Sequence, residues 1–221
     1  MKKLLGVGTE SFVRLRGNDC YYVDKTAFMK PLLASGGDVH LITRPRRFGK
    51  SLFISTIQEF LRVDPAHPGD ASRQERLFSG LKVLEDKPFC ERFMGRTPVL
   101  SLSFKDAAGE SFDAAYKSIA RMFAKAASRH AYLADSPHLN RNEKEIFQDY
   151  CSRRRMMDIS SLDDSAGFVG DMISFLARHF GRPAVLLIDE YDVPLAKAVS
   201  GGYYKSMALF MRQLLAPLKT G

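Results

Sequence analysis

The octapeptide at residues 44–51, Arg-Pro-Arg-Arg-Phe-Gly-Lys-Ser, carries most of the information about the fold class of this chain. It fits the phosphate-binding pattern G-x-x-x-x-G-K-[ST], except that Arg44 stands where the leading Gly is usual. The apolar run at 39–43 predicts a buried strand, and the apolar spacing over 50–61 predicts an amphipathic helix. Backbone N–H groups at such a strand–loop–helix junction face an anion. The sequence therefore predicts a phosphate-binding loop at this point.

A second signal follows a later apolar run. Residues 185–188 read Val-Leu-Leu-Ile, and Asp189 and Glu190 come directly after them. In an open parallel sheet, ligands bind at the carboxyl edge of the strands. One carboxylate there can hold Mg²⁺ through water while its neighbour polarises an attacking water. Alone, the pair is more typical of the start of a loop, but together with Gly-Lys-Ser at 49–51 it indicates a nucleotide hydrolase.

Predicted strands and helices alternate along the chain. Apolar runs predict strands at 39–43, 98–104 and 184–188. Helical spacing and capping residues predict helices over 24–36, 50–61, 111–133, 142–150, 163–180 and 203–215, with short helical stretches near 75–78 and 88–94. This order predicts an α/β fold with a mostly parallel sheet and a helical insertion between the second and third strands. With the phosphate loop, it indicates the three-layer P-loop NTPase fold.

The composition fits one globular domain in a reducing compartment. The 221 residues are 45% hydrophobic, enough to bury a core. The longest aliphatic run, at 184–188, is far shorter than the roughly 20 residues that cross a bilayer, so we expect no membrane partner. Cys20, Cys90 and Cys151 are odd in number and widely spaced, which argues against both a disulfide framework and a zinc site. We therefore expect a cytoplasmic protein.

The positive charge is concentrated near the N-terminus. The net charge is +8, and residues 1–50 hold ten Lys or Arg against four Asp or Glu. Such a segment is typical of binding to a nucleotide, a nucleic acid or a lipid surface, and a solvated basic face is the alternative. Arg46 and Arg47 lie inside the predicted loop, where a planar guanidinium suits phosphate oxygens. For the arginines at 153–155, nucleic-acid contact and a solvated helix end both stay open.

Six segments together resemble the AAA-ATPase-like domain common in bacterial proteins. They are, in chain order, Tyr21-Tyr22-Val23-Asp24-Lys25-Thr26, the octapeptide at 44–51, Phe89-Cys90-Glu91 near Met94-Gly95, Leu102-Ser103-Phe104-Lys105-Asp106, Leu187-Ile188-Asp189-Glu190-Tyr191-Asp192 and Gly202-Tyr203-Tyr204. The match runs from about Gly6 to the last residue. Members of this family are similar to P-loop ATPases with an additional strand and a catalytic Glu, and Arg is common among them at position 44. Most continue into a PD-(D/E)XK nuclease-like domain.

The resemblance implies a role for each matched residue. ATP is the expected ligand and Mg²⁺ its cofactor. The nucleotide-binding residues are expected to be Arg44, Pro45, Arg46, Arg47, Phe48, Gly49, Lys50, Ser51 and Leu52. Lys50 would neutralise the β- and γ-phosphates as one catalytic residue, and Glu190 would activate the attacking water as the other. Ser51 and Asp189 would hold Mg²⁺. The chain is therefore expected to be an ATPase.

The resemblance also implies an incomplete sheet, because the family has five core strands and three are predicted here. We expect residues 1–221 to be the N-terminal part of the ATPase domain, without its sensor strand and without a nuclease-like domain that would bind nucleic acid. The unpaired edges of such a sheet favour self-association and weak activity. A nucleotide-sensing or nucleic-acid-binding module without turnover and an inactive fragment are the alternatives. Tyr21 and Tyr22 either stack on adenine or pack in the core beneath the sheet.

Overall fold

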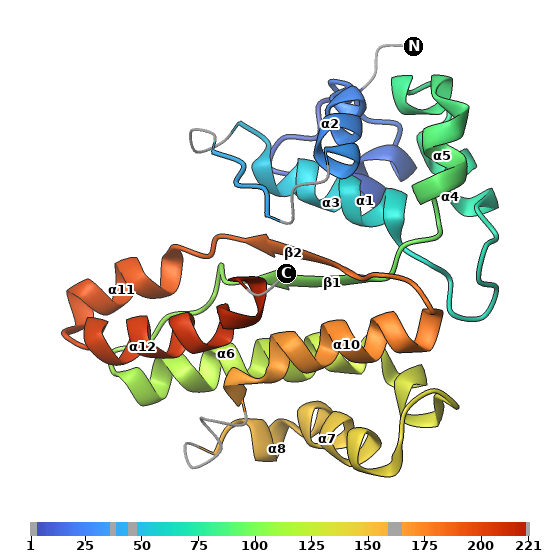
Figure 1. The fold of residues 1–221 in the computed structure, drawn as a ribbon. Coiled ribbons are helices and arrows are strands. Elements are labelled where there is room, and N and C mark those ends of the chain that lie inside the picture. Colours follow the sequence, from blue (N-terminus) through green and yellow to red (C-terminus); the bar gives the residue numbers. More distant parts are fainter. Residues whose placement is uncertain (1–3, 36–38, 44–47, 159–164, 220–221) are drawn as a thin grey trace. The chain divides into compact units, whose positions relative to one another are not determined.

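The computed structural model describes residues 4–35, 39–43, 48–158 and 165–219 (Figure 1). The chain is mixed α/β and mostly helical, with a small parallel sheet of two strands, β1 (Val99–Ser103) and β2 (Val185–Asp189). It divides into two compact units, Met1–Val99 and Leu100–Gly221. Each unit is described by itself. No helix in the described ranges is long and apolar enough to cross a membrane.

The first unit is helical and is built around α3. Its elements are α1 (Phe12–Gly17), η1 (Thr26–Phe28), α2 (Met29–Ala34), α3 (Lys50–Leu61), α4 (Ser72–Phe78), η2 (Lys82–Glu85) and α5 (Lys87–Phe93). The predicted helix over 50–61 is confirmed, and it buries Phe53, Ile57 and Phe60 as the spacing requires. The predicted helix over 24–36 is a 3₁₀ turn followed by the short α2.

Aromatic side chains hold α3 against its neighbours. The Phe60 ring packs edge-on against Phe78 of α4 at 5.4 Å between centroids, and stacks on Phe89 of α5 at 5.5 Å. Phe12 of α1 contacts Phe78 at 4.7 Å. Such ring pairs contribute about 0.5–1.5 kcal/mol each beyond the area that they bury. The position of α3 within this unit is therefore well fixed.

The predicted strand at 39–43 is wrong. These five residues are described, and none of them is in a strand. The side chains of Val39 and Leu41 are 64% and 65% exposed, although a buried strand was expected. A strand forms only where a neighbouring backbone accepts and donates its hydrogen bonds, and no residue in the described ranges pairs with this segment. A β-branched, apolar composition is therefore not sufficient to make a strand here.

The second unit contains the sheet, and the predicted strands at 98–104 and 184–188 are confirmed as β1 and β2. The strands lie side by side, and the Phe104 amide donates to the Asp189 carbonyl at 3.0 Å. Helices α6 (Phe112–Ser128) and α10 (Phe168–Phe180) cover one face of the sheet (Figure 1). Leu100 and Leu102 of β1 are buried there in one apolar cluster with residues of both helices. Residues 185–188 of β2 are only half-buried, although a continuous apolar run of this kind is typical of a fully buried strand.

The remaining helices follow the predicted order with shifted ends. Between β1 and β2 lie α6, η3 (Ala131–Asp135), α7 (Arg141–Cys151), α8 (Arg153–Met156) and α10, which confirms the helical insertion. After β2 come α11 (Val193–Gly201), α12 (Tyr204–Leu214) and η5 (Ala216–Lys219). The predicted helix over 111–133 ends at Ser128, and a 3₁₀ turn follows it. Helix α11 was not predicted; Pro194 lies in its first turn, where proline is tolerated.

Candidate functional site

Helix α3 begins at the second half of the predicted phosphate loop. Gly49 is its N-cap, and its φ of 77° lies in the left-handed region that glycine enters without strain. The Gly49 carbonyl accepts the first helical hydrogen bond from Phe53 N at 2.9 Å. Lys50 and Ser51 are the first two residues of the helix, and both are half-buried. The N-terminus of this twelve-residue helix therefore carries a lysine and a hydroxyl, beside N–H groups that have no partner within the helix.

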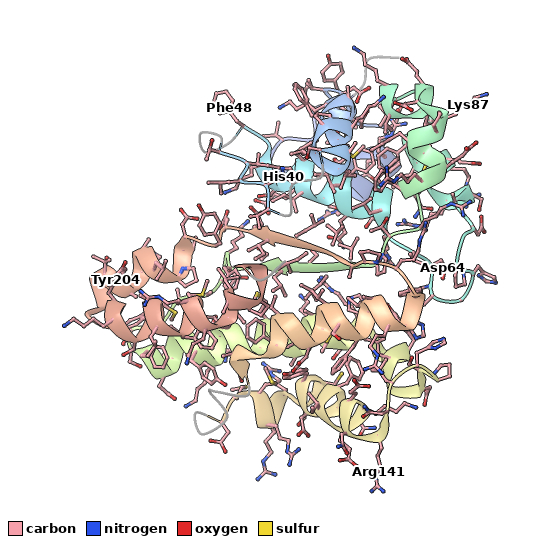
Figure 2. The ribbon with its side chains drawn as sticks, viewed as in Figure 1. His40, Phe48, Asp64, Lys87, Arg141 and Tyr204 are labelled. Atoms are coloured by element: carbon pink, nitrogen blue, oxygen red, sulfur yellow. The ribbon has the colours of Figure 1, made fainter. Side chains whose placement is uncertain are left out.

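The first half of the loop cannot be compared with the prediction, because Arg44, Pro45, Arg46 and Arg47 lie outside the described residues. Phe48 is described. Its side chain is 62% exposed and points outward (Figure 2). Leu52, the last predicted nucleotide-binding residue, is half-buried in the first turn of α3. The described part of the predicted site is thus the run from Phe48 to Leu52.

A second cation lies at the start of α3. The Lys25 ammonium donates to the Phe48 carbonyl at 3.4 Å. A Cβ atom placed on Gly49 would lie 3.9 Å from the same Nζ atom. Lys25 was not among the predicted site residues, although it lies in the Tyr-Tyr-Val-Asp-Lys-Thr segment that carries part of the family resemblance. That segment was the available signal, and within it only the tyrosines were given a candidate role in ligand binding.

The residues on either side of Lys25 are tied to η2. Asp24 Oδ1 accepts from the Thr26 amide at 2.8 Å and from the Thr26 hydroxyl at 2.6 Å, and Asp24 Oδ2 accepts from Lys82 N at 2.8 Å. The buried Thr26 hydroxyl oxygen also accepts from Val83 N at 3.1 Å. Partial burial alone would raise the pKa of Asp24, but these hydrogen bonds outweigh it and lower the pKa below its ordinary value. The backbone that carries Lys25 is therefore anchored by a carboxylate in its charged form.

Tyr22 fixes the same segment to α3. Its hydroxyl lies 3.4 Å from the Thr56 hydroxyl, and its ring packs edge-on against Phe12 at 5.1 Å. Burial raises the pKa of Tyr22. Of the two roles left open for the tyrosines, core packing therefore applies to Tyr22, against α3 rather than beneath a sheet. Tyr21 is 57% exposed.

The predicted carboxylates lie at the carboxyl end of β2, in the second unit. Asp189 is the last residue of the strand and is 8% exposed, less than the four residues before it. Glu190 follows with a φ of 54°, a left-handed conformation that costs a non-glycine residue of order 1–3 kcal/mol. Its carbonyl accepts from Val193 N at 3.1 Å, which closes the turn into α11. Strained residues of this kind concentrate at functional sites.

The structure therefore brings the predicted residues together in two groups. Phe48, Gly49, Lys50, Ser51 and Leu52 form the first group, and Lys25 joins them. Asp189 and Glu190 form the second. Within the described ranges, no three His, Cys, Asp or Glu side chains cluster closely enough to form a metal site of their own.

These features define a mixed α/β protein with a glycine-capped Lys-Ser helix start and an Asp-Glu pair after a sheet strand. The chain matches the family described as "Predicted AAA-ATPase" over residues 6–221, and it belongs to that family. It is 30% identical over 195 residues to a protein of Azotobacter chroococcum mcd 1 described as "Uncharacterized protein in vnfD 5'region". This match covers 88% of the chain but only 30% of the relative's length. No solved structure matches the chain.

Proposed function

We propose that this chain binds ATP with Mg²⁺ at the N-terminus of α3, and that the complete protein hydrolyses ATP. The observation that carries the proposal is the left-handed Gly49, which starts a twelve-residue helix with Lys50 and Ser51 in its first turn. The family match supports the same reading. The proposal includes the three-layer P-loop arrangement, with residues 1–221 as one part of the ATPase domain.

Phosphate binding would use backbone, hydroxyl and ammonium groups together. The first N–H groups of α3 and the positive end of the helix dipole attract an anion. Lys50 would neutralise the β- and γ-phosphates, and the planar guanidinium groups of Arg46 and Arg47 suit phosphate oxygens. Lys25, held at the Phe48 carbonyl, adds a further positive charge beside the same helix start. Each of these groups suits a polyphosphate better than a neutral ligand.

The proposed metal and water contacts rest on the chemistry of the donors. Mg²⁺ prefers oxygen ligands and keeps several waters, so a serine hydroxyl and one carboxylate are a sufficient protein contribution. Ser51 and Asp189 would supply these oxygens. When bound, Mg²⁺ would neutralise phosphate charge. Glu190 would orient the attacking water and accept its proton.

A titration of ATP into the chain tests the proposal. With Mg²⁺ present, calorimetry should give a saturable heat for the native chain and none for Lys50→Ala. Lys87→Ala is the matched control, because Lys87 is an exposed lysine of α5 in the same unit (Figure 2). Equal affinity for ATP in the native chain and Lys50→Ala would reject the assignment. Phosphate release by the full-length protein then separates an ATPase from a nucleotide sensor without turnover.

The proposed cytoplasmic location rests on the cysteines. Cys20, Cys90 and Cys151 are all free thiols, and burial raises the pKa of Cys90 and of Cys151. A thiol whose pKa is raised is less reactive, because the thiolate is the nucleophile. Free cysteines are typical of a reducing compartment, where disulfides rarely form.

A further inference from the structure

A basic groove lies in the second unit. Asp189 and Glu190 are not among the residues that line it. Its volume is about 400 Å³, and β1 and α6 form its walls. Its lining includes Ser101 and Ser103 of β1, Arg121 and Lys125 of α6, and Arg129, the residue that follows this helix. Asp106 is the one carboxylate residue in the lining, and its carbonyl accepts a hydrogen bond from Ser118.

The groove follows an unpaired edge of β1. In the part of the chain that the structure describes, β1 pairs with β2 alone. The Phe104 amide points toward β2, where it donates to Asp189. Backbone groups along a strand point to its two edges in alternation, so the N–H and C=O groups of Ser101 and Ser103 point away from β2. These two serines line the groove, whereas Leu100 and Leu102 do not. The groove wall therefore offers unused backbone donors and acceptors.

The opposite wall carries a stripe of positive charge. Arg121, Lys125 and Arg129 are spaced four residues apart and share one face of α6 and its end. Like charges at this spacing repel and destabilise a helix. No carboxylate among the described residues forms an ion pair with any of the three, whereas Lys117 of the same helix pairs with Asp113 at 2.7 Å. A bound anion would relieve this repulsion.

We propose that this groove binds an extended acidic peptide, which adds a strand to the open edge of β1. Strand addition uses the backbone groups of Ser101 and Ser103 for affinity. Side chains of an added strand alternate between the two faces of the sheet, so every second residue lies on the side of α6. Acidic residues at these alternate positions would face Arg121, Lys125 and Arg129. A nucleic acid satisfies the cations but has no row of amides and carbonyls to pair with β1.

Fluorescence anisotropy with defined probes tests the occupant. The probe is a labelled, end-capped ten-residue peptide that alternates Glu and Thr, added to the 221-residue chain. We expect saturable binding that weakens as salt is raised, and no binding of the matching Lys–Thr peptide. Two further peptides carry methyl groups on the backbone nitrogens along one edge or along the other edge of the Glu–Thr peptide. One of them should lose binding, because its methylated edge would face β1, and the other should keep it. A ten-nucleotide thymidine strand that binds more tightly and displaces the peptide would overturn the proposal, as would equal binding of both methylated peptides.

Variants of the chain test the two walls separately. Lys125→Ala with Arg129→Ala should weaken peptide binding at least tenfold, while Lys117→Ala, on the same helix but outside the groove, leaves it unchanged. Ser103→Pro removes an outward N–H group, and proline is tolerated on an edge strand. It should abolish binding, whereas Ser103→Ala keeps it. Circular dichroism confirms that each variant is folded. Unchanged binding in the double alanine variant, or in a folded Ser103→Pro variant, contradicts the proposal.

Discussion

The Lys25 ammonium lies 3.4 Å from the Phe48 carbonyl oxygen, at the residue before the glycine that starts α3. Hydrogen bonds of the neighbouring residues fix the backbone position of Lys25. Asp24 and Thr26 bond to the backbone of η2, and Tyr22 bonds to Thr56 of α3 itself. A long, flexible side chain is therefore carried by a backbone that is fixed on both sides. The helix start therefore keeps a positive charge beside it.

Replacement of Lys25 by Gln should weaken ATP binding while the chain stays folded. Gln keeps much of the length of the side chain and removes its charge. A hydrogen bond to a charged group contributes about 1.5–3 kcal/mol, so we expect the Kd for ATP to rise about tenfold or more. Calorimetry with Mg²⁺ measures the effect, and Lys87→Gln is the matched control. An unchanged Kd would show that Lys25 binds the Phe48 carbonyl but does not contribute to ATP binding.

Replacement of Glu190 by Gln should separate binding from hydrolysis. The amide has the shape of the carboxylate but cannot accept the proton of the attacking water, and loss of a general base typically costs about 10²–10⁴-fold in rate. In the full-length protein, phosphate release should fall by this order while ATP affinity is retained. Glu110→Gln, an exposed glutamate before α6, is the control. Undiminished turnover in the Glu190→Gln protein would remove Glu190 from the mechanism.

The left-handed backbone at Glu190 predicts an unusual order of stability. With a φ of 54°, an alanine at this position keeps the steric strain and a glycine relieves it. We expect Glu190→Gly to be more stable than Glu190→Ala by about 1 kcal/mol in urea unfolding, against the usual penalty for glycine. Both variants should lack hydrolysis in the full-length protein. Equal stability of the two would show that the backbone at residue 190 is not strained.

Local signals in the sequence were sufficient for some elements. The spacing of Phe53, Ile57 and Phe60 predicted α3, since one apolar stripe at helical spacing specifies an amphipathic helix. The run at 184–188 predicted β2, and with it the position of Asp189 and Glu190 at a strand end. These features depend on residues that are neighbours in the chain.

Other features depend on residues that are distant in the chain. The run at 39–43 has the composition of a strand, but a strand also needs a partner, and composition does not supply one. The position of Lys25 depends on the bond from Lys82 N to Asp24, across 58 residues. No local pattern predicts such a contact. The left-handed conformation of Glu190 was likewise not predicted, because glutamate rarely adopts it.

The hydrogen bonds of Asp24 predict a pH dependence of stability with a definite sign. The pKa of Asp24 is lowered from its ordinary value of 3.8, so the folded chain favours the carboxylate. The resulting stabilisation is fully present above pH 3.8, and it is lost as the pH falls from there through the lower pKa of the folded state.

Asp24→Asn tests this sign, because the amide keeps one acceptor oxygen and loses the other. At pH 6 we expect the variant to be less stable than the native chain by about 1 kcal/mol, the net value of one hydrogen bond. Below pH 3.8 the difference should shrink, since protonation removes the same acceptor from the native chain. Urea unfolding at pH 6 and pH 3 measures both values, with the exposed Asp135→Asn as control. A difference that stays constant or grows toward pH 3 would show that Asp24 is not held as a carboxylate, and that Lys25 is not anchored by it.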